Sequence, residues 1–221
     1  MTQRSFRWLA VTLAVIGLAS DQATKYGMFK WLYNEGRSES DGAFRSWSFT
    51  LPSGVKQYHG EYNLIDGWFK FTAEFGDTPK PCDCGFSKLQ TWSAPVMPHV
   101  NQGALFGFLR EHKELSNGLF ATVSILAALG IVFWLTRRSA AHDRWLSAAL
   151  GLILGGTVGN FYDRIVFNGV RDFLYFYKID WPVFNVADCC LVVGAVMLLV
   201  HAFITPSEPK TETAPAVPAA V

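Results

Sequence analysis

Five acidic or amide side chains lie in or beside two otherwise apolar segments near the end of the chain, at residues 155–174 and 184–194. An ionisable group inside a membrane span is energetically costly, so its presence there indicates a functional site. Neither segment brings a Ser–His or Cys–His pair to a matching depth, which favours aspartic-type hydrolysis within a membrane. The five residues are Asn160, Asp163, Asp172, Asn185 and Asp188.

Asp172 and Asp188 are the candidate catalytic pair. Asp172 follows the turn-like Asn168-Gly169 and Asp188 belongs to the last apolar segment, so the two carboxyl groups can converge from different elements. Attack of water on a peptide bond needs one carboxylate to accept a proton and one protonated carboxyl group to polarise the carbonyl. Two close carboxyl groups in a partly dry site share one proton. The spacing leaves open that one aspartate caps a helix or pairs with Arg171.

A glycine stripe precedes this pair. Gly151, Gly155 and Gly159 recur every four residues, which places them on one helix face and allows close helix contact in lipid. Asp163 continues the same face one turn later. The interpretation favoured for Asp163 is a structural ion pair with Arg164 or another cation, with direct catalysis as the alternative.

The composition indicates a membrane protein. Half of the 221 residues are hydrophobic and only 17% are charged. A net charge of +1 without a long Lys/Arg run gives no electrostatic basis for a nucleic-acid partner. Crossing roughly 30 Å of hydrocarbon takes about 20 helical residues. Four segments are long and apolar enough, at residues 8–29, 115–136, 145–167 and 184–205.

Positive charges set the expected orientation. Arg137, Arg138 and Arg144 crowd the short connection between the second and third spans, and Arg4 and Arg7 flank the first. The positive-inside rule places these residues, and hence both chain termini, in the cytoplasm. The first span could instead be a cleaved secretory signal. Its apolar character continues beyond the polar stretch 21–25, so we expect it to be retained.

The spans divide the chain into four parts. A stretch too long for a plain connector separates the first two spans, and it alternates like half-buried strands at residues 47–51 and 69–75. We therefore predict a membrane all-α fold of four transmembrane helices with a small extracytoplasmic β-sheet lobe. The parts are the N-terminal segment and first helix (1–32), the β-rich lobe with an insertion (33–114), helices two to four with a catalytic loop (115–205) and a disordered cytoplasmic tail (206–221).

The four cysteines form two close pairs. Cys82 and Cys84 could make a bond or half of a metal site, but no second pair completes a zinc site. Cys189 and Cys190 lie in a span and are interpreted as small apolar packing residues. We expect neither a metal nor another cofactor.

Five motifs occur in a characteristic order along these elements. They are Asp21-Gln22-x-Thr24-Lys25, Asn101-x-Gly103-Ala104-x-Phe106, Gly155-Gly156-x-x-Gly159-Asn160-x-x-Asp163-Arg164, Val170-x-Asp172-Phe173 and Phe184-Asn185-x-Ala187-Asp188. In this order the motifs resemble those of bacterial lipoprotein signal peptidase, also called signal peptidase II. The resemblance covers residues 21–194 apart from a polar insertion.

The resemblance implies an inner-membrane aspartyl endopeptidase with both termini in the cytoplasm. Such an enzyme removes signal peptides from diacylglyceryl-modified prolipoproteins by cleaving before the lipidated cysteine, in contact with membrane lipid and without a metal. By the same resemblance Asp172 and Asp188 are catalytic. The positions that line or brace the site are Asp21, Lys25, Asn101, Gly103, Asn160, Asp163, Arg164 and Asn185. We expect the protein to be monomeric.

The chain departs from the family pattern in its polar insertion, which falls within residues 33–98, and in Cys189, which stands where a serine is common. Two alternatives use the same buried aspartates differently. A small membrane transporter would relay protons or bind a polar substrate through them, and discontinuous spans or inverted repeats would favour it. An inactive lipoprotein-binding scaffold is the other alternative, although both candidate catalytic aspartates are present.

Overall fold

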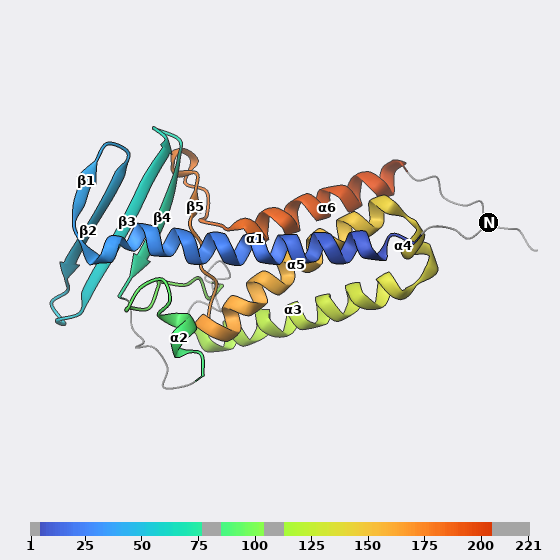
Figure 1. Cartoon of the computed structure of the whole chain (residues 1–221), viewed down its shortest axis with the longest axis horizontal. Helices are drawn as coiled ribbons and strands as arrows, with labels where there is room; N and C mark the ends of the chain where they lie inside the picture. The colour runs from blue at the N-terminus through green and yellow to red at the C-terminus, as the bar shows by residue number, and fades with distance from the viewer. Residues whose placement is uncertain (1–4, 77–84, 104–112, 205–221) are drawn as a thin grey trace, which may run out of the picture.

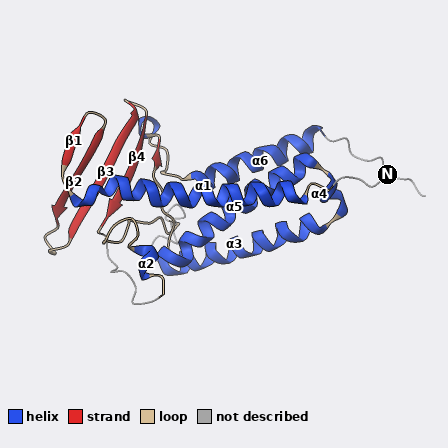
Figure 2. Cartoon of the chain, viewed as in Figure 1, coloured by secondary structure: helices blue, strands red, loops and turns tan. Residues whose placement is uncertain are grey.

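Four long helices run side by side, and an antiparallel sheet closes one end of the bundle (Figures 1 and 2). The computed structural model describes residues 5–76, 85–103 and 113–204. The long helices are α1 (Arg7–Tyr33), α3 (Lys113–Thr136), α5 (Arg144–Phe167) and α6 (Val186–Ile204). The short ones are η1 (Asn34–Gly36), α2 (Ser87–Gln90), α4 (Arg138–His142) and η3 (Tyr177–Ile179). The four long helices coincide with the four predicted segments.

Glycines bring α5 against α1, as the stripe predicted. A Cβ atom on Gly151 would lie 2.5 Å from the Ala10 carbonyl oxygen, and one on Gly155 would lie 2.7 Å from that of Ala14. Neither position can therefore carry a side chain without moving the α1 backbone. This close contact places α5 next to α1, with α6 packed on another side of α5. Cys190 of α6 packs near α1, whereas Cys189 is exposed, so the packing interpretation of the cysteine pair is wrong for Cys189.

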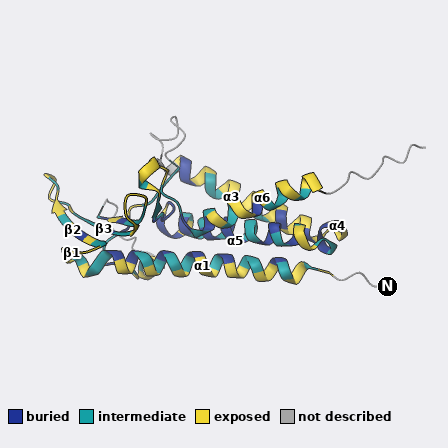
Figure 3. Cartoon of the chain, turned by 90° about the horizontal axis from the view of Figure 1, so that it is seen from above, coloured by how far each residue is buried: buried dark blue, intermediate teal, exposed yellow. Residues whose placement is uncertain are grey.

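The outer helix faces are apolar and exposed (Figure 3). Within the described residues, α3 from Leu115 to Thr136 and α6 are each long and apolar enough to cross a membrane. The other two long helices, α1 and α5, carry the charged and amide residues of the buried site. Because these polar residues lower their mean hydropathy, composition alone does not identify them as spans.

The sheet has five strands in the order β1-β2-β3-β4-β5. They are β1 (Glu39–Asp41), β2 (Phe44–Thr50), β3 (Lys56–Ile65), β4 (Phe69–Phe75) and β5 (Leu174–Tyr175). Phe29 and Leu32 of α1 pack with Phe75 and Phe173 in a core between the bundle and the sheet. A Cβ atom on Gly60 would collide with the carbonyl oxygen of Leu32, so the sheet approaches α1 where β3 has no side chain.

The structure confirms the predicted combination of helices with a β-sheet, but it corrects the all-α class and the extent of the sheet. A five-stranded sheet joined to four long helices is a mixed α and β architecture rather than an all-α one. The predicted strands at 47–51 and 69–75 correspond to β2 and β4, whereas β1, β3 and β5 were not predicted. The sheet also extends beyond the predicted lobe at residues 33–114, because β4 pairs with β5 from the segment between α5 and α6. The predictions for Cys82, Cys84 and the tail 206–221 lie outside the described residues.

Candidate active site

Asn185 and Asp188 form a reciprocal cap at the start of α6. The Asn185 side-chain oxygen accepts a hydrogen bond from the Asp188 backbone N–H at 3.0 Å, and the Asp188 carboxylate accepts one from the Asn185 backbone N–H at 3.1 Å. This arrangement is a capping box, which satisfies two backbone donors of the first turn. A helix N-terminus also favours a negatively charged group. Asp188 therefore caps a helix, as one alternative proposed, through one carboxylate oxygen, and its other oxygen accepts a hydrogen bond from Asn160.

Backbone hydrogen bonds on both sides of Asp172 fix its position. Val170 and Asn101 exchange backbone hydrogen bonds of 2.7 and 2.9 Å. On the other side, the Phe173 carbonyl accepts a hydrogen bond from the Thr72 N–H of β4 at 2.9 Å. The sheet and the loop at residue 101 thus hold the segment on which Asp172 is placed.

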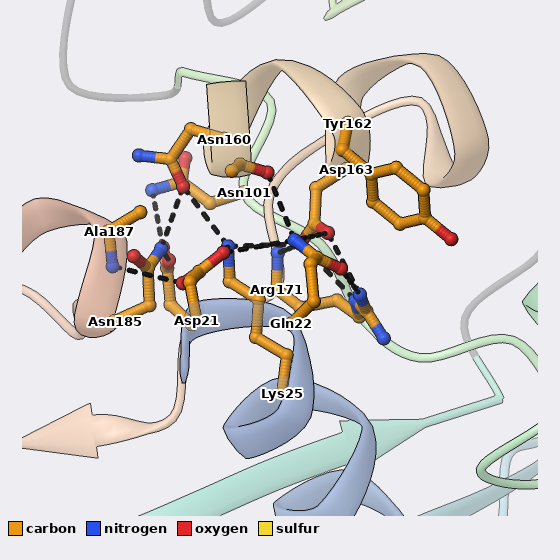
Figure 4. Close-up of polar contacts among 12 residues, drawn as sticks. Asp21, Gln22, Lys25, Asn101, Asn160, Tyr162, Asp163, Arg171, Asn185 and Ala187 are labelled. Atoms are coloured by element: carbon orange, nitrogen blue, oxygen red, sulfur yellow. Dashed lines mark hydrogen bonds and ion pairs between the residues drawn. The ribbon is translucent and has the colours of Figure 1, made fainter. Parts of the chain in front are cut away.

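Neutral amides contact both candidate catalytic carboxyl groups. The Asn101 and Asn185 side chains each donate a hydrogen bond to Asp172, at 3.0 and 2.7 Å. Asn160 donates to Asp188 at 2.8 Å. Asn185 also donates to the Asn160 side-chain oxygen at 3.1 Å, which connects the two halves of the site (Figure 4). The structure therefore brings Asp172 and Asp188 into one hydrogen-bonded network.

The environment of Asp172 favours its protonated form. Burial, together with the nearby Asp188, raises the pKa of the Asp172 carboxyl group to about 7, while the amides of Asn101 and Asn185 act in the opposite direction. Asp172 and Asp188 are nevertheless both only partly buried as residues. A proton can therefore be held at Asp172 near neutral pH.

A second acidic centre is neutralised by cations. Asp163 forms a two-point ion pair with Arg171, at 2.8 and 3.2 Å, and also accepts the Arg171 backbone N–H at 2.9 Å. Lys25 Nζ lies 2.9 Å from Asp21 and 3.4 Å from Asp163. All four side chains are at most 1% exposed. The negative charges of the two carboxylates balance the positive charges of the two cations. We call these four residues the charge cluster.

The charge cluster connects three helices (Figure 4). Asp21 of α1 accepts a hydrogen bond from the Ala187 backbone N–H of α6 at 2.9 Å. Gln22 accepts one from Arg171 at 2.9 Å and donates one to the Gly159 carbonyl of α5 at 3.1 Å. Lys25 donates to Asn160 at 3.1 Å, which joins the cluster to the aspartate pair. Neither Gln22 nor Arg171 was predicted as a site residue.

Asp163 forms the predicted structural ion pair, but not with Arg164. Its partners are other cations, which was the alternative. Successive helical residues point in directions about 100° apart, so Asp163 faces α1 while Arg164 faces α3. Arg164 lies over the Phe120 ring at 4.9 Å and donates weakly to Asn117 at 3.4 Å. Arg171 likewise pairs with Asp163 rather than with a candidate catalytic aspartate.

The backbone conformation at position 103 explains why a glycine occupies this predicted site position. Its φ of +94° is unfavourable for other residues, and its N–H donates to the Asn101 side-chain oxygen at 2.9 Å. Ser116 and Asn117 of α3 support the same region, because Ser116 donates to the Gln102 carbonyl at 2.6 Å and Asn117 to Asn168 at 2.8 Å. Neither α3 residue was predicted, since two polar residues at the start of an apolar helix resemble an ordinary helix end.

Within the described ranges, no three His, Cys, Asp or Glu side chains are grouped so that they could share a metal ion. The site residues predicted from the motifs all lie in one of two polar groups or beside them. Asp172 and Asp188 form the aspartate pair, to which Asn101, Asn160 and Asn185 donate hydrogen bonds. Of the predicted residues, Asp21, Lys25 and Asp163 belong to the charge cluster.

Comparisons with known proteins identify the family that this chain matches. The family model described as signal peptidase (SPase) II matches residues 63–204. A lipoprotein signal peptidase of Rhodopirellula baltica is 43% identical over 128 residues, covering 51% of this chain and 55% of that protein. One of Pseudomonas putida is 42% identical over 106 residues, covering 47% of this chain and 61% of that protein. The matched region is thus less than two thirds of these relatives' length.

A solved structure gives a likeness of fold. It is titled as a bacterial membrane enzyme structure by the in meso method at 2.3 Å resolution, and it matches with a TM-score of 0.57. The match covers 95% of this chain and 99% of the other at 20% sequence identity. The helical bundle with its terminal sheet is therefore shared with a known membrane enzyme.

Proposed function

This chain belongs to the signal peptidase II family, and from that premise we propose that it is an aspartyl endopeptidase of prolipoproteins. It cleaves diacylglyceryl-modified precursors immediately before the lipidated cysteine. The single observation that supports this activity most is the amide-connected pair of Asp172 and Asp188. The comparisons favour this activity over a transporter or an inactive scaffold.

The two aspartates take different roles in the proposed reaction. Asp188, at the N-terminus of α6, accepts a proton from the attacking water, while protonated Asp172 donates a hydrogen bond and then its proton to the substrate carbonyl oxygen. Collapse of the resulting diol breaks the C–N bond. The proton held by Asp188 passes to the leaving nitrogen, and Asp172 regains its proton from a diol hydroxyl group. The pair thus returns to its starting state with one shared proton.

The supporting residues orient this pair. Asn160 and Asn185 contact both the pair and each other, so they fix the relative position of the carboxyl groups. The charge cluster holds α1, α5 and α6 together beneath them. Arg164, on the α3 side, contributes positive potential toward the two aspartates.

We further propose that α1, α3, α5 and α6 all cross the bacterial inner membrane. The beginning of α1 and the end of α6 lie at the same end of the bundle, opposite the sheet (Figure 1). An even number of crossings requires this, and Arg137, Arg138 and Arg144 lie at that end as the positive-inside rule expects for the cytoplasm. The sheet and the aspartate pair then lie at the outer boundary, where a lipid-anchored substrate is presented to a monomeric enzyme.

The test uses the purified full chain and a synthetic precursor peptide. With the diacylglyceryl group on its cysteine, the peptide is expected to be cut immediately before that cysteine, which mass spectrometry of the products shows. The same peptide without the lipid is the matched control and should be cut much more slowly. Cleavage at another bond, or no cleavage of the lipidated peptide, would contradict the proposed function.

A further inference from the structure

An exposed apolar surface lies at the edge of the sheet, outside the aspartate pair and the charge cluster. It combines the turn between β3 and β4 with the segment that follows β5. Its members are 39% to 61% exposed, which is high for large apolar side chains. We call it the tip patch, and it consists of Ile65, Trp68, Phe176, Ile179 and Trp181.

Direct contacts join the two halves of the tip patch. The rings of Phe69 and Phe176 lie 4.7 Å apart, and Lys178 Nζ lies 3.6 Å from the centre of the Trp68 ring. The Lys178 backbone N–H also donates to the Trp68 carbonyl at 3.5 Å. The β3–β4 turn and the segment before α6 lie side by side at the top of Figure 1. Two segments distant in sequence therefore build one surface.

The chemistry of the tip patch fits a lipid surface. Tryptophan is favoured at the membrane interface, where its ring contacts acyl chains and its N–H contacts headgroups. Lys178, which no ion pair neutralises among the described residues, lies against the Trp68 ring, and such a cation attracts lipid phosphates. Large exposed apolar patches on water-facing surfaces are otherwise rare.

The tip patch is also continuous with the apolar surface of the bundle. Phe176 stacks on Phe184 with ring centres 5.7 Å apart, and Phe184 lies just before α6. The outward side of α6 then continues with exposed Val192, Val193 and Val196. A bilayer in contact with α6 would therefore reach the tip patch at its headgroup level.

We propose that the tip patch anchors the sheet in the headgroup region of the outer leaflet beside α6. This inference rests on the membrane topology proposed above. The anchor has a consequence for the site, because β4 pairs with β5 and the Phe173 carbonyl next to Asp172 is bonded to Thr72 of β4. The depth of the tip patch in the bilayer thus sets the height of Asp172 relative to the lipid-anchored substrate.

The first test measures depth without using activity. The protein is placed in lipid nanodiscs that carry bromine on acyl carbons either near the headgroup or near the chain end. Subtracting the fluorescence of Trp68→Phe or Trp181→Phe from that of the unaltered protein isolates each tryptophan. Trp47→Phe is the control, because Trp47 lies on β2, farther from the bundle than β3 and β4 (Figure 1). Shallow bromines should quench Trp68 and Trp181 but not Trp47, and equal quenching of Trp68 and Trp47 would overturn the proposal.

The second test distinguishes contact of the tip patch with lipid from contact of the tip patch with the substrate. The triple variant Ile65→Ser, Trp68→Ser, Ile179→Ser should lose about fivefold to tenfold in kcat/KM on the lipidated peptide in nanodiscs, but keep the unaltered rate in detergent micelles. The double variant Trp47→Ser, Phe49→Ser is the matched control on β2 and should keep its rate in both media.

Three outcomes of the second test are distinguishable. Equal losses in nanodiscs and micelles would indicate direct contact with the substrate and would overturn the lipid anchor, as would unchanged rates in both media. If the unaltered protein cleaves in neither medium, the proposed function fails, and the quenching measurement still decides the anchor. Thermal melting of each variant in micelles verifies that it is folded.

Discussion

The two acidic centres of this protein are joined by Asn160, yet their carboxyl groups have opposite partners. In the charge cluster, Asp163 contacts the full positive charges of Arg171 and Lys25. In the aspartate pair, Asp172 receives hydrogen bonds from the neutral amides of Asn101 and Asn185. Cations hold a carboxylate in its charged form, whereas amides position a carboxyl group and still allow it to bind a proton. The first centre is therefore suited to structure and the second to proton transfer.

Replacing either member of the aspartate pair should have the largest effect. Asp172→Asn and Asp188→Asn preserve shape and much of the hydrogen bonding, but an amide cannot accept a proton from water or hold the shared one. We expect the cleavage rate to fall by at least about 10³-fold in each variant, with melting that still shows a folded protein. A purified variant with full activity would remove that residue from catalysis.

Replacing a member of the charge cluster should instead destabilise the protein. Asp163→Asn leaves Arg171 and Lys25 buried without their shared partner, and breaking a buried pair on one side costs about 3–5 kcal/mol. Thermal unfolding should therefore shift to lower temperature along with activity. The double variant Asp163→Asn, Arg171→Gln is the matched control and should recover part of the loss, because it removes the uncompensated charge. An Asp163→Asn protein with unaltered melting and no turnover would indicate direct participation in the reaction.

The two centres should also differ in their response to pH. Folding raises the pKa of Asp172 from 3.8 to about 7, so its carboxyl group is protonated below pH 7 and charged above it. The proposed reaction needs the protonated form, and kcat/KM should fall about tenfold per pH unit above that value. A pH profile of peptide cleavage checks this, and a rate that stays constant from pH 6 to pH 9 would be inconsistent with Asp172 as the acid.

The same shift in pKa predicts a change in stability. A carboxyl group with a raised pKa favours folding when protonated, so its contribution is lost as the pH rises from about 4 to about 7. Asp172→Asn removes the ionisable group and should therefore raise the melting temperature more at pH 8 than at pH 5. Melting curves of this variant and the unaltered protein at both pH values provide the measurement. Equal shifts at the two pH values would show that burial of a charge at Asp172 is not costly.

The smallest expected effect concerns the helix contact that supports both centres. Gly155→Ala places a methyl group against the α1 backbone at Ala14, and such overpacking costs about 1–3 kcal/mol. Gly130→Ala on α3 is the matched control, because a Cβ atom there meets no other group within 4 Å. Chemical unfolding in the same detergent should show a loss for Gly155→Ala alone. Equal stability of the two variants would show that the close α1–α5 contact does not contribute to the stability of the protein.

Sequence patterns predicted the helices well and the sheet only in part. Long apolar runs give reliable helices, and the four-residue glycine spacing identified the face of α5 that meets α1. Strand β3 was missed because it carries Lys56, His59 and Glu61, with Glu61 buried against Lys70 at 2.6 Å. Strand β5 has only two residues, which is too short for an alternation to be visible.

The site was predicted as a set of residues rather than as a geometry. The motifs identified both aspartates and their amides, but charge partners depend on directions that spacing does not provide. Arg171 lies next to Asp172 in an extended segment, where successive side chains point to opposite sides. It therefore pairs with Asp163, and only the folded arrangement of α1, α5 and the following loop makes that partner evident.

The contrast between the two centres is tested most directly by counting the protonated carboxyl groups. Difference infrared spectroscopy of the full chain in nanodiscs, between pH 6 and pH 9, detects the C=O stretch of a carboxyl group that loses its proton. We predict one such band, with a midpoint near the Asp172 pKa of about 7. The band should be absent in Asp172→Asn and present in a folded Asp163→Asn protein. A band that persists in Asp172→Asn, or that disappears only in Asp163→Asn, would contradict this prediction.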